Sequence, residues 1–312
     1  MNTGNNASHV ILPQEALAIL IWQIFPPILI IIGTIGNTLS VIVLTRKSMR
    51  RSHMSNMPLY LTFLAVSDIL VLYSGLLRQW IIYMFDVDVR DLHPALCKVN
   101  TWLVYVSLDL SAWILVSVTI ERALLVWYPL TAKVMCTTKT VTVNMIVVCF
   151  SLLGINSHFF LLCGAETEIY DYFLEYVFPW IDLCLFSIGP FLFHIVGNTF
   201  IIIRLVTGIR IMAQLHMASN ERAVMRQRQV TSMTVMLLSL NLVYLVCTLP
   251  ISMYLVSLIY WEKDESPEAD AQRRLVYACV NLLMYLNNST NFITYTFSGR
   301  QFRMEFYALF CK

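Results

Sequence analysis

The fold of this chain is decided by a charge-free run, ALAILIWQIFPPILIIIGTIGNTLSVIVLT, which occupies residues 16–45. An apolar run of about 18 or more residues is long enough to cross a bilayer as a helix. Of the 312 residues, 58% are hydrophobic and 13% are charged, whereas a soluble domain has roughly 45–50% apolar and about 25% charged residues. The composition therefore argues against a soluble enzyme and predicts a membrane protein that crosses the bilayer several times.

Seven stretches are long and apolar enough to be spans. Each must be helical, because a backbone amide in hydrocarbon finds no water to bond and the stretches lack the alternation of barrel strands. We predict an all-α bundle of seven transmembrane helices over residues 16–300, between an N-terminal segment at 1–15 and a short amphipathic helix or tail at 301–312. The expected spans are 16–45, 57–77, 99–120, 140–165, 176–203, 229–261 and 275–299.

The charges of alternate loops predict the orientation in the membrane. The first, third and fifth connections and the C-terminal tail carry fifteen basic residues against three acidic ones. The opposite side carries six basic residues against fourteen acidic ones. Because Lys and Arg accumulate in cytoplasmic loops, we expect a multi-pass protein of the plasma membrane with an extracellular N-terminus and a cytoplasmic C-terminus.

Six short motifs lie within or beside these spans in a fixed order. They are Gly36-Asn37, LAVSD at 64–68, Glu121-Arg122 followed by Pro129-Leu130, Pro190, CTLP at 247–250, and NFITY at 291–295. Together they resemble the rhodopsin-like class of G-protein-coupled receptors over about the whole chain. The separation of twenty-five residues between Cys97 and Arg122 is also the one that this family uses. The resemblance implies a seven-helix receptor, similar to the neuropeptide-receptor branch, and not an enzyme.

Asp68 is the costliest residue of the second span, because a charge at the centre of a membrane helix is penalised by about 2.5–3.5 kcal/mol on insertion scales. It is expected to face the interior of the bundle. The resemblance implies a small polar cavity that holds an allosteric sodium ion, the one metal or cofactor expected. The alternative is a protonated Asp68 in a structural hydrogen-bond network. The partners that the resemblance supplies are Asn37, Ser111, Asn287 and Asn291.

Glu121 and Arg122 follow the third span at its cytoplasmic end. A guanidinium can pair with a carboxylate in one state and with backbone carbonyls of a partner in another. The family resemblance makes this pair, with Tyr295, a switch for a heterotrimeric G protein. The alternative for Arg122 alone is an ordinary arginine at the membrane interface, whose aliphatic chain lies in the membrane while its guanidinium reaches water. Arrestin is a further partner that the resemblance implies, and no nucleic acid is expected.

Three modifications are predicted near the ends of the bundle. Cys97 and Cys163 lie close to the oxidising outer face, where a disulfide can persist, and such a bridge would join the third span to the loop after the fourth. Asn6 begins a glycosylation sequon in the outer N-terminus. Cys311 ends a stretch with an apolar helical face, which indicates contact with membrane lipid and a palmitoyl anchor; a frayed tail is the alternative.

The expected ligand site lies at the outer mouth of the bundle. Each candidate has a structural alternative: interface snorkelling for Arg78, a hydrogen-bonded core acid for Asp109, and interhelical packing for the aromatic residues. The candidates are Arg78, Trp102, Tyr105, Asp109, Asp182, Tyr254, Tyr277, Asn281 and Tyr285.

The outer loops carry an acidic rim, which would attract a cationic ligand. We therefore expect a small basic or amidated neuropeptide, although the rim could also follow from the exclusion of positive charge. Biogenic amines are disfavoured because Val104 occupies the position of the aspartate that binds them. The alternatives from other classes are a non-signalling scavenger receptor and a transporter or channel.

The chain departs from the family pattern at several positions. Ala123 replaces the tyrosine of the Asp-Arg-Tyr triplet, Thr248 replaces the tryptophan before the span-six proline, and Phe292 replaces the span-seven proline. Asn198 stands where a tyrosine is usual. These changes place the usual switching elements in doubt and favour a role for Tyr244 and Tyr295 instead.

Overall fold

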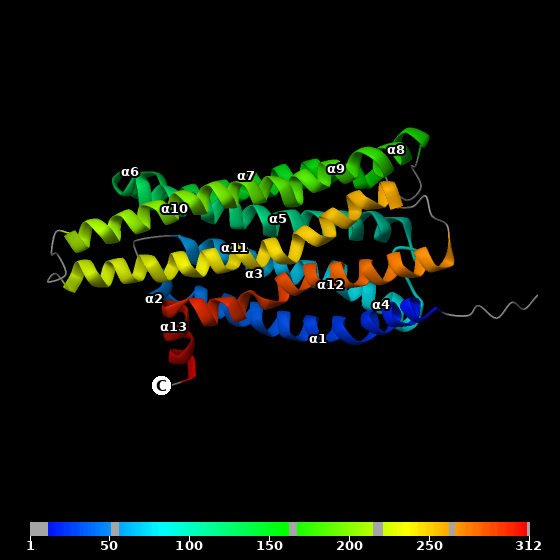
Figure 1. Cartoon of the computed structure of the whole chain (residues 1–312), viewed down its shortest axis with the longest axis horizontal. Coiled ribbons are helices and arrows are strands. Elements are labelled where there is room, and N and C mark those ends of the chain that lie inside the picture. Colours follow the sequence, from blue (N-terminus) through cyan, green and yellow to red (C-terminus); the bar gives the residue numbers. More distant parts are fainter. Residues whose placement is uncertain (1–11, 51–55, 162–166, 215–220, 262–265, 311–312) are drawn as a thin grey trace, which may run out of the picture.

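A computed structural model describes residues 12–50, 56–161, 167–214, 221–261 and 266–310. The described residues form a long bundle of roughly parallel and antiparallel helices, without a strand among them (Figure 1). The all-α architecture is therefore confirmed. The helices are α1 (Pro13–Leu44), α2 (Lys47–Arg50), α3 (Met57–Val71), η1 (Leu72–Leu76), α4 (Leu77–Phe85), α5 (Pro94–Trp127), α6 (Pro129–Met135), α7 (Thr138–Ile155), η2 (Asn156–Leu161), α8 (Glu168–Tyr172), η3 (Phe173–Val177), α9 (Phe178–Asp182), η4 (Leu183–Ile188), α10 (Gly189–Gln214), α11 (Glu221–Trp261), α12 (Pro267–Ser298) and α13 (Arg300–Phe310).

Several of the rods are continuous through a change of helix type. The second rod runs from α3 through the π-helical turn η1 into α4, and the fifth runs from α8 through η3, α9 and η4 into α10. Proline begins α1, α5 and α12, where its missing N–H costs no hydrogen bond. The second, third and fifth rods are longer than the apolar runs of the sequence, because their helical backbone continues into the polar flanks.

Six of the described helical rods are long and apolar enough to cross a membrane. The seventh, α12, carries many polar side chains, and the buried ones include Asn281, Asn287, Asn288, Ser289 and Asn291. It packs against both α1 and α11. These amides and hydroxyls face the protein interior, so α12 completes a seven-helix bundle although its composition is the least lipid-like.

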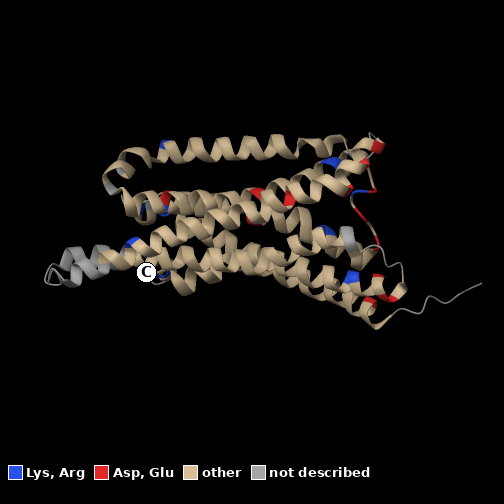
Figure 2. Ribbon diagram, turned by 45° about the horizontal axis from the view of Figure 1, so that its top comes forward, with Lys and Arg blue, Asp and Glu red and all other residues tan. Residues whose placement is uncertain are grey.

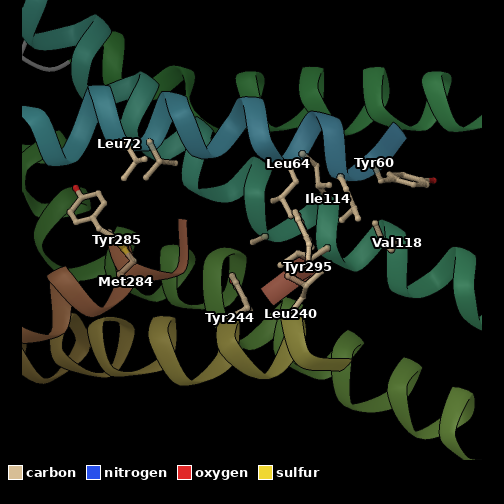
Figure 3. Close-up of a cluster of buried hydrophobic side chains, with 14 of the residues drawn as sticks. Tyr60, Leu64, Leu72, Ile114, Val118, Leu240, Tyr244, Met284, Tyr285 and Tyr295 are labelled. Carbon is tan, nitrogen blue, oxygen red and sulfur yellow. The ribbon is translucent and has the colours of Figure 1, made fainter. Parts of the chain in front are cut away.

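Charged residues gather toward the two ends of the bundle, and most of the ribbon between them is uncharged (Figure 2). A buried apolar cluster fills this middle between α3, α5, α11 and α12 (Figure 3). Tyr295 lies there between Leu64, Ile114 and Leu240 (Figure 3). The two polar ends are therefore separated by a packed core.

The short helix α13 follows α12 at the end that also carries α2 and α6 (Figure 1). Phe302 is buried, and Phe306 packs edge-on against Phe292 with ring centroids 5.3 Å apart. Arg46 Nε lies 3.2 Å from Glu305 Oε2. Part of the apolar face and one ion pair thus hold this amphipathic helix against the bundle, whereas its contact with membrane lipid stays a prediction.

Close contact between helices depends on glycine at Gly33 of α1. A Cβ built there would lie 2.4 Å from Leu72 Cδ1 and 3.1 Å from the Ser289 Cα. We expect Gly33→Val to destabilise the protein by about 1–3 kcal/mol, the usual cost of overpacking. Thermal unfolding in detergent would show a lower midpoint. The matched control is Gly154→Val, because a Cβ at Gly154 meets nothing within 4 Å; equal midpoints for the two variants would contradict the prediction.

Candidate functional site

A cavity of about 160 Å³ opens near the end of the bundle that carries the N-terminal end of α1. Six of the nine expected ligand residues line it, and they come from four helices, three of them from α12. Arg78 is on α4, Tyr105 on α5, and Asp182 on α9. The lining residues are Gly75, Arg78, Gln79, Arg90, Val104, Tyr105, Leu108, Asp182, Phe186, Ile251, Ser252, Leu255, Tyr277, Asn281, Met284 and Tyr285. We call this the outer cavity.

Gly75 allows Tyr285 to reach across the outer cavity from α12. A Cβ at position 75 would lie 2.4 Å from Tyr285 Oη. The phenol therefore occupies space that any other residue at this position would fill. Nothing in the sequence signals this approach, because a glycine within an apolar helix is commonplace.

The other three expected ligand residues face neighbouring helices instead of the cavity. Trp102 Nε1 donates to the Leu153 carbonyl at 3.3 Å. Asp109 Oδ2 accepts a hydrogen bond of 2.9 Å from Asn156 Nδ2, so Asp109 is a bonded core acid. Tyr254 Oη donates to the Arg273 carbonyl at 3.0 Å, above the cavity lining. For these three, the structural alternatives describe the arrangement better than a ligand contact.

Two arginines approach the outer cavity from the side of α4 and the loop that follows. Arg78 Nε donates to Asp88 Oδ1 at 2.8 Å, and a second bond joins Arg78 Nη2 to Asp88 Oδ2. Arg90 Nε donates to Asn100 Oδ1 at 3.0 Å. Burial acts to raise the pKa of Asp88, but the bond from Arg78 and the backbone N–H of Arg90 outweigh it and lower this pKa from its ordinary value. Arg90 lines the outer cavity although the sequence does not predict it as a ligand residue.

A polar network surrounds Asp68 in the middle of the bundle. The carboxylate is fully buried and accepts three hydrogen bonds from other helices: Ser111 Oγ at 2.9 Å, Asn288 Nδ2 at 2.8 Å and Asn291 Nδ2 at 2.7 Å. Asn37 lies one step away, because its Nδ2 donates to the Asn288 carbonyl at 2.9 Å. Asn288, missed in the sequence, takes the place that was expected of Asn287.

The network also contains acceptor oxygens that no described donor satisfies. They are Oδ1 of Asn37 and Asn288, and Oδ1 of the adjacent Asn287 is likewise buried without a described donor. A buried oxygen without a donor is costly unless water or a cation occupies the space beside it. Among the described residues no group of three or more His, Cys, Asp and Glu side chains could hold a metal ion, so a cation here would rely on amide and carboxylate oxygens.

At the opposite end of the bundle, Arg122 of α5 is 4% exposed and lies between two methionines. Its Nη2 is 3.0 Å from Met57 Sδ and 3.4 Å from Met233 Sδ. Glu121 Oε1 accepts from the Asn56 backbone N–H at 3.0 Å. Thioether sulfur is a weak acceptor, so the guanidinium is held without a strong counterpart in this arrangement.

A second cavity, of about 390 Å³, lies beside this arginine. We call it the inner cavity. Its walls come from α1, α2, α3, α11 and α13, and methionine is their most frequent residue. The lining residues are Leu44, Met49, Met57, Pro58, Leu61, Ser232, Met233, Met236, Gly299, Arg300, Gln301, Phe302, Met304 and Glu305. Apart from the position of Arg122, no feature of the sequence predicts this cavity.

The altered switch positions make contacts of their own. Tyr244 Oη donates to the Phe186 carbonyl within η4, and Thr248 Oγ1 donates to the Tyr244 carbonyl at 2.7 Å. Asn241 Nδ2 donates to Asn198 Oδ1 at 3.1 Å, which joins α11 to α10. Tyr295 is buried, and its hydroxyl has no partner among the described residues. Tyr244 therefore links α11 to the π-helical turn of the fifth rod.

The predicted modifications are only partly within the described residues. Cys97 is engaged in a disulfide, whereas Cys163 lies outside the described residues, so their pairing stays a prediction. Asn6 and Cys311 also lie outside them. Cys136, Cys149, Cys184, Cys247 and Cys279 are free thiols.

The seven-helix bundle, with a polar cavity at one end and a buried arginine at the other, defines the architecture of a multi-pass membrane receptor. Residues 36–295 match the seven-transmembrane receptors of the rhodopsin family. Because the match covers most of the chain, this protein belongs to that family. Its members are receptors, which confirms that the chain is not an enzyme, and the family in general requires no cofactor.

Several curated receptors are similar to this chain. It is 24% identical to the FMRFamide receptor of Drosophila melanogaster over 90% of this chain and 52% of that receptor. It is 22% identical to the QRFP-like peptide receptor of Branchiostoma floridae over 91% of this chain and 75% of the relative. For the Galanin receptor 2b of Danio rerio the identity is 24%, over 91% of this chain and 73% of the relative. The chain thus spans only about half the length of the first of these receptors.

Proposed function

We propose that this protein is a plasma-membrane receptor that binds a small extracellular peptide and activates a heterotrimeric G protein. The outer cavity carries this proposal, because charged and aromatic side chains from several helices converge there. Ligand pockets commonly combine such apolar walls with a few polar groups that fix orientation. The FMRFamide and QRFP-like receptors, similar over nine tenths of the chain, are named for peptides.

The proposed orientation places the N-terminus and the outer cavity outside the cell, and α13 in the cytoplasm. It rests on the unequal distribution of Lys and Arg between the two sides. On the outer side, a bridge between Cys97 and Cys163 would fix the loop after α7 beside the mouth, and Asn6 would carry a glycan. On the inner side, Cys311 would carry a palmitoyl chain beside α13, at the membrane lipid.

An allosteric sodium ion beside Asp68 is part of the proposal. The residues fit a cation because a carboxylate and the donor-free oxygens of Asn37 and Asn288 belong to one buried network. Oxygen atoms are the ligands that hard cations prefer. The positive charge of such an ion would stabilise the arrangement of the helices that brings these oxygens together.

In signalling, binding of a ligand in the outer cavity would change the arrangement of the helices around the inner cavity. A ligand can shift the helices only if it binds one arrangement more tightly than the other. Movement of the inner end of α11 would separate Met233 from Arg122 and leave its N–H groups free for carbonyls of a G protein. Arrestin would use the same exposed surface.

A non-signalling scavenger receptor is the second candidate, and Ala123 and Thr248 favour it because they alter positions at which the family pattern places its switch. Nucleotide exchange on purified G proteins, in the presence of pools of short peptides, separates the candidates. A signalling receptor accelerates exchange in a peptide-dependent manner. Internalisation of peptide without exchange indicates a scavenger, and movement of a solute without either indicates a transporter.

A further inference from the structure

The outer cavity contains one charged group of each sign, Arg90 and Asp182, that forms no ion pair with another described residue. Arg78 has a matching carboxylate in Asp88, with which it forms two bonds. Arg90 has none: the side-chain bond that it makes is to the neutral Asn100, and none of the ion pairs among the described residues includes it. Burial and the neighbouring charge of Arg78 lower the pKa of the Arg90 guanidinium, and the opposing charge of Asp88, which already pairs with Arg78, does not cancel this effect.

Asp182 presents the opposite charge to the same cavity from α9. It is 9% exposed, and no donor within the described part of the chain bonds its carboxylate. The other acid nearby, Asp109, is occupied by Asn156. A cationic group of a ligand in the cavity could form a charge-assisted hydrogen bond with this carboxyl group.

The positions of these groups are fixed before any ligand arrives. Asn100 Nδ2 donates to the Ser74 carbonyl at 3.0 Å, which holds the acceptor of Arg90 in place. The backbone N–H of Arg90 is itself bonded to Asp88 Oδ1 at 2.9 Å. Because the described residues use only the Nε of Arg90, its terminal N–H groups can bind a carboxylate, and a guanidinium does so with two parallel bonds.

We infer that the outer cavity binds a ligand end that carries both an anion and a cation: a free C-terminal carboxylate at Arg90 and an ammonium or guanidinium at Asp182. This inference rests on the proposed function as a peptide receptor and names the chemistry of its ligand. A volume of about 160 Å³ accommodates the end of a peptide and not its whole length. The remainder would lie toward the acidic loops. A C-terminal amide, the alternative expected from the sequence, offers Arg90 no charge.

The test uses pentapeptide pools in four forms: C-terminal arginine or norleucine, each with a free carboxylate or an amide. Binding to the full-length receptor is read as thermal stabilisation without G protein, because any ligand of the native state raises the unfolding midpoint. We expect the arginine acid pool to stabilise at about tenfold lower concentration than its amide or the norleucine acid, as charged hydrogen bonds allow.

Two variants assign each preference to its residue. Arg90→Gln should abolish the preference for acid over amide and keep that for arginine, whereas Asp182→Asn should do the reverse. Lys98→Gln, a cation of the outer end that does not line the cavity, should keep both. Equal or better stabilisation by the amides overturns the inference and leaves the peptide receptor standing; no stabilisation by any of the four pools overturns both.

Discussion

Replacing Asp68 with alanine is expected to give the largest loss of stability of any single change in the bundle core. Three donors from α5 and α12 point at this carboxylate. A buried donor left without an acceptor costs about 1–3 kcal/mol, so we expect Asp68→Ala to lower the free energy of unfolding by about 3 kcal/mol or more. The variant should show a strongly reduced unfolding midpoint in detergent and little surface expression.

Asp68→Asn is the matched control because it keeps the shape and one acceptor oxygen. That oxygen can still accept from Ser111 and Asn288, and Asn291 can turn its amide to present oxygen to the new N–H group. The midpoint should therefore lie close to that of the wild type, whereas any stabilisation by sodium should be lost with the charge. If Asp68→Ala were as stable as Asp68→Asn, the hydrogen bonds would contribute little and the network would not be a structural centre.

The second large effect is expected at the inner end. Arg122→Ala should remove peptide-stimulated nucleotide exchange almost completely, by more than about tenfold, since a charged hydrogen bond contributes about 1.5–3 kcal/mol. Binding of peptide at the outer cavity should change by less than about threefold, because the packed core separates the two ends. Exchange assays and thermal stabilisation by the same peptide measure the two quantities.

Lys139→Ala is the control for this prediction, because Lys139 is an exposed cation at the start of α7, away from the inner cavity. It should leave both exchange and binding unchanged. Met233→Leu offers a finer comparison: it keeps the volume and removes the sulfur contact to Arg122, so it should raise exchange in the absence of peptide. A normal response in Arg122→Ala would exclude this arginine from coupling.

The sequence predicts the seven rods because the length of an apolar run and the need to satisfy backbone amides leave few alternatives. It does not predict how each rod is rotated. Asn287 and Asn288 are adjacent, and a step of one residue turns the side chain by about 100° on a helix of 3.6 residues per turn. Only packing against α1 and α3 decides that Asn288, and not Asn287, bonds Asp68.

The candidate site, too, is predicted by the sequence only in part. Arg78, Tyr105 and Asp182 could be placed near the outer mouth by counting residues along their helices. Arg90 could not, because it follows α4 in a short connection whose path depends on the αL residue Asp86 and on the bonds to Asp88. The inner cavity was also missed, since methionines spread over several helices meet only in the folded bundle.

The polarity of α12 has a consequence for how the receptor is made. This rod emerges after the other six during synthesis, and its buried amides make it a poor substrate for direct transfer from the translocon into lipid. It must therefore enter the bilayer together with α1 and α11, which shield those amides. Quality control in the endoplasmic reticulum should consequently retain variants that disturb the contacts of α12 with α1 and α11. Such a variant would not reach the cell surface, where ligand is present.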